Sequence, residues 1–137
     1  MKLRSNVLYF LPLGGAGEIG MNLNLYAYNN EWLMVDLGVT FYDRLGVDLM
    51  MPNPQYIIEK RKQLRGLLLT HAHEDHIGAV PYIWEQLKCP IYATPFTAEL
   101  VRRKFKERSV DYGDFIHEIP LEGHQKIGPF DIELVSL

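Results

Sequence analysis

The apolar residues of the N-terminal part follow the two-residue period of β-strands. Residues 7–13 are mostly apolar and are followed by a glycine cluster, a pattern that predicts a strand. Every second residue of 23–27 is apolar, which is the period of a half-buried strand. Asn29 and Asn30 predict a tight turn, and the apolar segment 32–37 predicts a second strand, so these two strands should form a hairpin.

Helical periods and proline positions mark the elements that follow. After a long loop over 38–54, the apolar run 64–70 is long enough for a buried strand. Residues 77–87 place their apolar side chains on one face of a helix. Pro81 is compatible only with the first turn of that helix, so we expect the helix to begin just after His76.

A second helix follows a short strand at 91–93. Thr94 and Pro95 have the order of a helix cap and a first-turn proline, and the helical pattern continues to about Glu107. We expect its inward-facing side chains to be Phe96, Leu100 and Phe105.

The strands 115–119 and 130–137 complete the pattern and are joined by a segment that contains Gly123 and Gly128. Strands, then alternating strands and helices, then strands again predict a mixed α/β layered domain. The last predicted strand runs to Leu137 without a polar tail, so we expect the sequence to be part of a longer protein.

Composition places the chain among ordinary globular proteins. With 137 residues, 47% hydrophobic and 23% charged, it can form one domain with a core and is not a disordered segment. A net charge of −3 excludes binding of nucleic acid through bulk positive charge. We expect two clusters of Lys and Arg, at 60–65 and 102–108, to be solvated faces. The single cysteine, Cys89, predicts a small buried thiol in a cytoplasmic protein.

The strongest chemical signal is the hexapeptide HAHEDH between a predicted strand and a predicted helix. Imidazole and carboxylate groups are ligands of zinc and similar divalent ions. His71 and His73 lie two residues apart and face one side of an extended segment, and a following turn can bring Asp75 and His76 to a second point nearby. With Glu74 the hexapeptide holds five potential ligands, too many for one closed tetrahedral site, so two adjacent metals, each completed from elsewhere in the chain, fit better than one. The alternative is a solvated polar loop, which three histidines in one hexapeptide disfavour. We expect Glu74 to point outward or to support a ligand.

Three weaker signals accompany the hexapeptide. Asp36 ends an apolar strand, where it either supports a metal-binding histidine or caps a turn. Residues 15–20 match the dinucleotide pattern G-x-G-x-x-G, but an alternating strand rather than a helix follows, so we expect a glycine loop that lets the backbone approach a site. We expect His117 and His124 to be structural.

HAHEDH is the HxHxDH motif of the metallo-β-lactamase fold. The segment 13–22, Leu-Gly-Gly-Ala-Gly-Glu-Ile-Gly-Met-Asn, resembles the opening of ribonuclease J-type enzymes, the β-CASP branch of that fold. The segments 35–38, 46–52 and 76–82 are similar to the same family. The resemblance covers essentially the whole chain and implies part of a metallo-β-lactamase-type αββα sandwich with a mixed β-sheet.

The resemblance also implies a metal-dependent ribonuclease with two divalent ions, zinc in preference to manganese. His71 and His73 would bind the first ion, Asp75 and His76 would bind the second and act in catalysis, and Asp36 would support them. The family's later ligands and its β-CASP domain have no counterpart in this sequence, so residues 1–137 should be inactive alone, with metal absent or partial.

The resemblance leaves the mode of cleavage open between endonuclease and 5′-exonuclease action. It implies RNA as the partner, no membrane, and a homo-oligomer for the full-length protein. Two other functions remain open on the sequence: a hydrolase of a small thioester or lactam with the same fold, and a metal-binding or RNA-binding module without catalysis.

Overall fold

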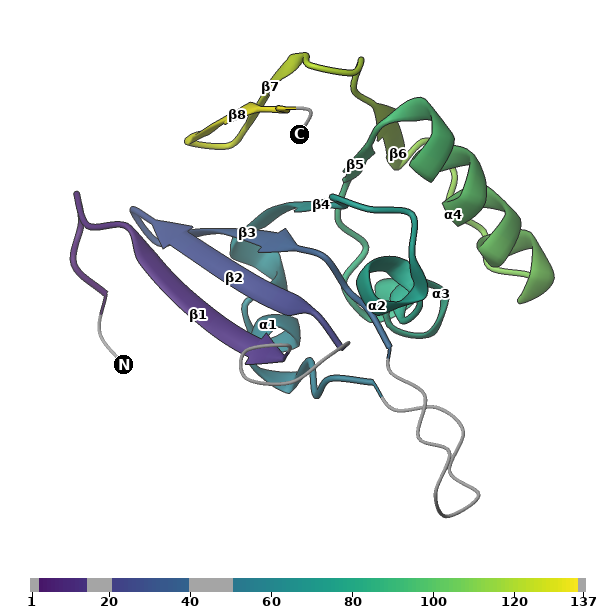
Figure 1. Cartoon of the computed structure of the whole chain (residues 1–137). Helices are drawn as coiled ribbons and strands as arrows, with labels where there is room; N and C mark the ends of the chain where they lie inside the picture. Colours follow the sequence, from purple (N-terminus) through teal and green to yellow (C-terminus); the bar gives the residue numbers. More distant parts are fainter. Residues whose placement is uncertain (1–2, 15–20, 40–50, 136–137) are drawn as a thin grey trace.

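A six-stranded mixed sheet forms the centre of the computed structural model, which describes residues 3–14, 21–39 and 51–135 (Figure 1). The first three strands are antiparallel, and the third to sixth are parallel. In spatial order, which is also chain order, they are β1 (Tyr9–Gly14), β2 (Leu23–Tyr28), β3 (Glu31–Val35), β4 (Leu64–Leu68), β5 (Ile91–Ala93) and β6 (Ile116–Glu118).

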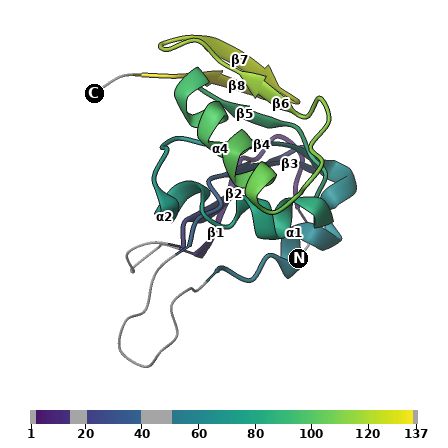
Figure 2. The same ribbon diagram turned by 90° about the vertical axis from the view of Figure 1, so that its right-hand side faces the viewer.

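Helices cover one face of this sheet, and a separate hairpin lies over the other face (Figure 2). The helices are α1 (Gln55–Glu59), α2 (Glu74–Ile77), α3 (Val80–Ile83) and α4 (Pro95–Glu107), with 3₁₀ turns at Arg61–Gln63 and Trp84–Gln86. The hairpin consists of β7 (His124–Ile127) and β8 (Phe130–Glu133). The layers are those of the expected α/β sandwich.

The hairpin of β2 and β3 confirms the prediction from alternation. The apolar residues of β2, Leu23, Leu25 and Ala27, are fully buried among the helices, and their neighbours in sequence are half-buried. Asn29 and Asn30 both adopt left-handed backbone, with φ of 51° and 61°. Two consecutive left-handed residues give a turn whose twist matches the twist of the strands that it joins.

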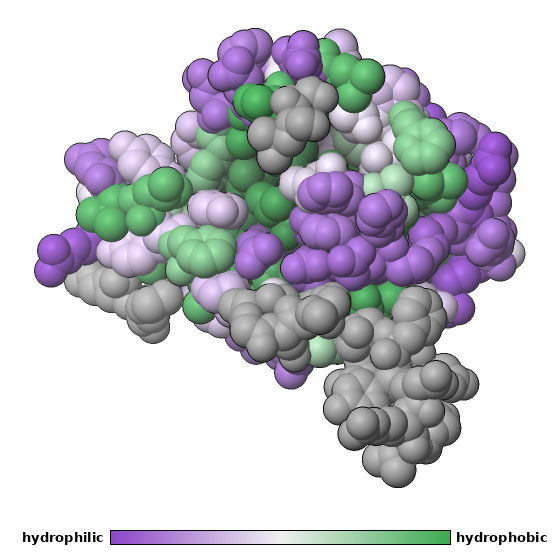
Figure 3. Space-filling view, viewed as in Figure 1, coloured by the Kyte–Doolittle hydropathy of each residue, from purple (hydrophilic) through white to green (hydrophobic). Residues whose placement is uncertain are grey.

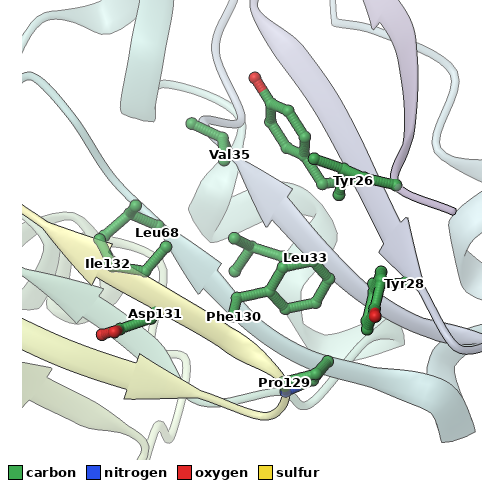
Figure 4. A pocket seen from close by; sticks show the side chains of 10 residues that line it. Tyr26, Tyr28, Leu33, Val35, Leu68, Pro129, Phe130, Asp131 and Ile132 are labelled. Atoms are coloured by element: carbon green, nitrogen blue, oxygen red, sulfur yellow. The ribbon is translucent and has the colours of Figure 1, made fainter. Parts of the chain in front are cut away.

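A hydrophobic hollow lies between the sheet and the β7–β8 hairpin. A small buried cluster joins the two layers, and next to it is a cavity of about 510 Å³. Hydrophobic side chains gather there on the surface (Figure 3), and Leu33, Val35 and Leu68 of the sheet face Phe130 and Ile132 of the hairpin (Figure 4). The expected strand over 130–137 is shorter, since β8 ends at Glu133, and β7 was not predicted.

The single helix expected over 77–87 is wrong. The segment forms α2, α3 and a 3₁₀ turn, and α2 already begins at Glu74. A continuous helix would need the amide of Ala79 to bond to the carbonyl of Asp75. That carbonyl instead accepts from the backbone N (3.2 Å) and the side-chain Nδ2 (2.7 Å) of Asn22, and the Ala79 amide donates to Leu37 O at 3.0 Å. Tertiary hydrogen bonds therefore replace helical ones.

The helix α4 has the predicted bounds, but one of its expected inward residues is wrong. Phe105 is fully buried and Leu100 is half-buried, whereas Phe96 is 71% exposed. The buried stripe of α4 consists of Thr97, Ala98, Val101 and Phe105. The expected burial of Cys89 is confirmed: burial raises the pKa of its thiol to about 12.

Candidate metal centre

The histidine motif lies where two neighbouring parallel strands end. Val35, the last residue of β3, pairs with Leu68, the last residue of β4. The Asp36 amide continues this pairing with a bond to Leu68 O of 2.9 Å. Because parallel strands end at the same edge of a sheet, Asp36 after β3 and Thr70 after β4 meet there.

Asp36 is the most buried polar group of the site, at 4% exposure. Its Oδ1 accepts a hydrogen bond from the Thr70 amide (2.8 Å), and its Oδ2 accepts from the Thr70 hydroxyl (2.7 Å) and lies 2.7 Å from His76 Nδ1. The residue has left-handed backbone, with φ of 65°, which Asp tolerates better than most side chains. The carboxylate therefore both closes the turn after β3 and holds a histidine of the motif.

The contact with Asp36 determines which nitrogen of His76 is free to bind a metal. A carboxylate can only accept hydrogen bonds, so in the neutral imidazole Nδ1 carries the proton. The lone pair of Nε2 then remains available, and this atom lies 3.4 Å from Oδ2 of Asp75. His76 and Asp75 thus present a nitrogen and an oxygen ligand side by side.

The other two histidines lie beside this pair. The ring of His71 is 4.4 Å from that of His76 and 6.3 Å from that of His73, measured between centroids. Asp36, His71 and His76 can place their ligand atoms within 4.8 Å of one another. Imidazole nitrogens with carboxylate oxygens match a zinc-type or manganese-type ion, so these residues fit a divalent metal.

Asp36 is better suited to orienting the ligands than to binding a metal. Its two oxygens are both already in hydrogen bonds, one with the Thr70 amide and the other with the Thr70 hydroxyl and His76. Glu74 is exposed, as expected of an outward residue, and forms an ion pair with Lys104 of α4. This ion pair connects the motif to the long helix.

A ladder of backbone hydrogen bonds holds the motif against the end of β3. Beside this ladder, Asn22 holds the carbonyl oxygen of Asp75 with two further hydrogen bonds. The ladder consists of bonds from Leu37 N to His76 O (2.7 Å), from Val39 N to Glu74 O (2.9 Å) and from Ala79 N to Leu37 O (3.0 Å).

Thr70 and Asn22 were not among the functional residues expected from the sequence. Thr70 directly precedes the motif. The sequence feature that could have indicated its role is a hydroxyl at the end of a predicted strand, next to two candidate metal ligands. Asn22 ends the segment 13–22 that resembles ribonuclease J-type enzymes, but no local pattern indicates its contact with Asp75, 53 residues later in the sequence.

The remaining candidates lie apart from the cluster. The ring of His117 stacks on Tyr92 with centroids 5.2 Å apart, and Nε2 of the exposed His124 is 3.7 Å from Glu133. The glycine-rich segment 15–20 lies outside the described residues, and β2 follows it in the sequence as expected. The residues that line the cavity under the hairpin include none of the motif's histidines or carboxylates.

Comparison with known proteins agrees with this fold. Residues 20–135 match the family model of the metallo-beta-lactamase superfamily. The chain belongs to this superfamily.

Within the superfamily, the chain is similar to ribonuclease J proteins. It is 45% identical to ribonuclease J of Sinorhizobium meliloti, over 95% of this chain and 24% of that protein. It is 39% identical to ribonuclease J 2 of Staphylococcus saprophyticus, over 81% of this chain and 20% of that protein. The chain thus spans about a quarter or less of the length of these relatives.

Solved structures share the fold at low sequence identity. A subclass B3 metallo-beta-lactamase from a soil metagenome library aligns with a TM-score of 0.58 at 14% identity, over 92% of this chain and 48% of that one. The short form of human tRNase Z aligns with a TM-score of 0.52 at 17% identity, over 82% and 44%. Among the described residues, no helix is long and apolar enough to cross a membrane.

Proposed function

We propose that this chain forms part of the metal centre of a metal-dependent ribonuclease. The observation that carries the proposal is the arrangement of His71, Asp75 and His76 around the buried Asp36 at one strand edge. The 45% identity to a ribonuclease J supports RNA as the substrate. The alternative of a small thioester or lactam substrate has weaker support, because the lactamase neighbours are only 14–16% identical and share the fold alone.

Each residue of the site has a distinct role in this proposal. His71 and His73 would hold one divalent ion, and Asp75 and His76 would hold the second. Asp36 keeps the proton of His76 on Nδ1, so that the lone pair of Nε2 would be free to bind the ion. When bound, the two ions would supply Lewis-acid activation of water and of the phosphoryl group.

We further propose that later segments of a longer protein complete the site. The chain offers two ligands for each ion, fewer than the three protein ligands that a catalytic zinc usually has. The curated relatives extend well beyond the matched region, which leaves room for further ligands and for the second wall of an RNA cleft. In this view residues 1–137 are the N-terminal part of the catalytic domain of a cytoplasmic, homo-oligomeric ribonuclease and do not cleave RNA alone.

The experiment replaces Asp75→Asn and His76→Ala together in the longer protein. Removal of both ligands of one ion should lower RNA cleavage about a thousand-fold or more, since a Lewis acid contributes several kcal/mol to the barrier. The fold should persist, because the two side chains are 39% and 20% exposed and Asp36 keeps both of its bonds to Thr70.

The matched control makes the same chemical changes away from the site, Asp114→Asn and His124→Ala, at two exposed positions. It should cleave RNA like the unchanged protein. Unchanged cleavage by the variant with altered Asp75 and His76 would show that the motif is not the catalytic centre. Robust cleavage by purified residues 1–137 would show that no later segment is needed.

A further inference from the structure

The hydroxyl of Thr70 lies between a histidine of the motif and the buried carboxylate. Thr70 Oγ1 is 2.7 Å from Asp36 Oδ2 and 2.9 Å from His71 Nδ1. The same Oδ2 atom lies 2.7 Å from His76 Nδ1. Two histidines are therefore connected to one carboxylate oxygen, His76 directly and His71 through the threonine.

The number of protons in this chain of contacts determines the direction of each hydrogen bond. A hydroxyl has one proton to donate, and a carboxylate can only accept. Thr70 therefore donates to Asp36, and a lone pair of its oxygen must accept a hydrogen bond from the Nδ1–H of His71. In the neutral ring this leaves Nε2 of His71 without a proton, and Nε2 is then the atom that can bind a metal.

We propose that Thr70 is a positioning residue that sets the tautomer of His71 and so prepares it to bind metal. This inference rests on the proposed metal centre. It adds that one carboxylate, Asp36, orients ligands of both ions, one of them through the Thr70 hydroxyl. His71 is exposed, so without this bond water can hydrate either ring nitrogen and the proton is free to move to Nε2.

Two substitutions at Thr70 separate the hydroxyl from the rest of the residue. Thr70→Val keeps the shape of the side chain and the backbone bond from the Thr70 amide to Asp36 Oδ1, but it removes the hydroxyl. Thr70→Ser keeps the hydroxyl. A structural role of the threonine methyl group would be lost in the serine variant, whereas the proposed role would be lost in the valine variant.

The first measurement needs no metal. Long-range ¹H–¹⁵N NMR spectra of the apo protein, recorded above the ordinary titration range of imidazole, report which nitrogen of each histidine carries the proton. His71 should be protonated on Nδ1 in the unchanged protein and in the serine variant, and should shift toward Nε2 in the valine variant. The exposed His124 should be the same in all three. An unchanged His71 tautomer in the valine variant would overturn the inference.

The second measurement is a Zn²⁺ titration followed in the same spectra. Loss of a group that orients a metal-binding histidine typically weakens metal binding 10- to 100-fold, so the valine variant should bind Zn²⁺ about that much more weakly, and the serine variant should bind like the unchanged protein. If the valine variant bound Zn²⁺ with the same affinity as the unchanged protein, the inference about Thr70 would be wrong, whereas the proposed metal centre would not be affected. Weak Zn²⁺ binding by the unchanged protein is expected of residues 1–137, but absence of binding throughout the titration would overturn the metal centre, and the tautomer spectra would then show whether Thr70 positions His71.

Discussion

A methyl group at Gly38 would occupy space that the backbone of the candidate metal-binding motif fills. A Cβ atom at this position would lie 1.7 Å from Asp75 O, 2.1 Å from the carbonyl carbon of Asp75 and 2.7 Å from His76 N. All three are backbone atoms, so no side chain can rotate away. Gly38→Ala must therefore push the end of β3 away from α2.

The size of the effect follows from these distances. The nearest contact must lengthen by about 1.3 Å to reach the 3.0 Å below which Cβ contacts essentially never occur. Such overpacking typically costs about 1–3 kcal/mol, and each backbone bond of the adjoining ladder that is weakened adds up to about 1 kcal/mol. We expect the free energy of unfolding to fall by about 2–4 kcal/mol. Zinc affinity should fall at least about 10-fold, because metal–ligand distances tolerate errors of only about 0.2 Å.

Urea unfolding and Zn²⁺ titration measure the two effects. Gly113→Ala is the control, because no atom lies within 4 Å of its Cβ position; its φ of +49° predicts a loss of about 1 kcal/mol and unchanged zinc affinity. If the Gly38 variant matched the unchanged protein in both stability and zinc affinity, the close approach of these two segments would not exist in solution.

Two further predictions concern the thiol and the metal content. Burial raises the pKa of the Cys89 thiol to about 12 from 9.0, so with rising pH the unfolded chain loses this proton before the folded one does. The free energy of unfolding should therefore fall by roughly 1.4 kcal/mol per pH unit above pH 9. Urea unfolding curves measured across this range should show that slope, and Cys89→Ala should remove it. Equal slopes in both proteins would contradict the buried thiol. Residues 1–137 should retain little zinc after dialysis, because two ligands do not complete the coordination of either ion. Elemental analysis that finds two ions per chain would contradict the need for later segments.

Local patterns in the sequence predicted the elements whose structure is decided locally. The alternation in β2 and the two asparagines after it were sufficient for the hairpin, because period and turn chemistry agree there. The bounds of α4 followed from Thr94 and Pro95 at its start. The density of histidines in HAHEDH was sufficient to mark the candidate metal ligands.

The break between α2 and α3 could not be predicted from residues 77–87. It depends on Asn22, which takes the carbonyl of Asp75, and on Leu37, which takes the amide of Ala79. The role of Thr70 was hidden for the same reason, since its partner Asp36 lies 34 residues earlier in the chain. The motif predicted which side chains could bind a metal, and the position of Asp36 indicated a supporting carboxylate, whereas its contacts with Thr70 and His76 depend on strands whose pairing only the fold reveals.

The hydrogen-bond ladder beside the motif also has a consequence for dynamics. The amides of Leu37, Val39 and Ala79 all donate across the junction of the two segments, so each can exchange its hydrogen for deuterium only when the segments separate. Their exchange rates would therefore report the free energy of opening this edge of the sheet. Similar rates at all three would identify the strand end and the histidine segment as one cooperative unit that opens as a whole.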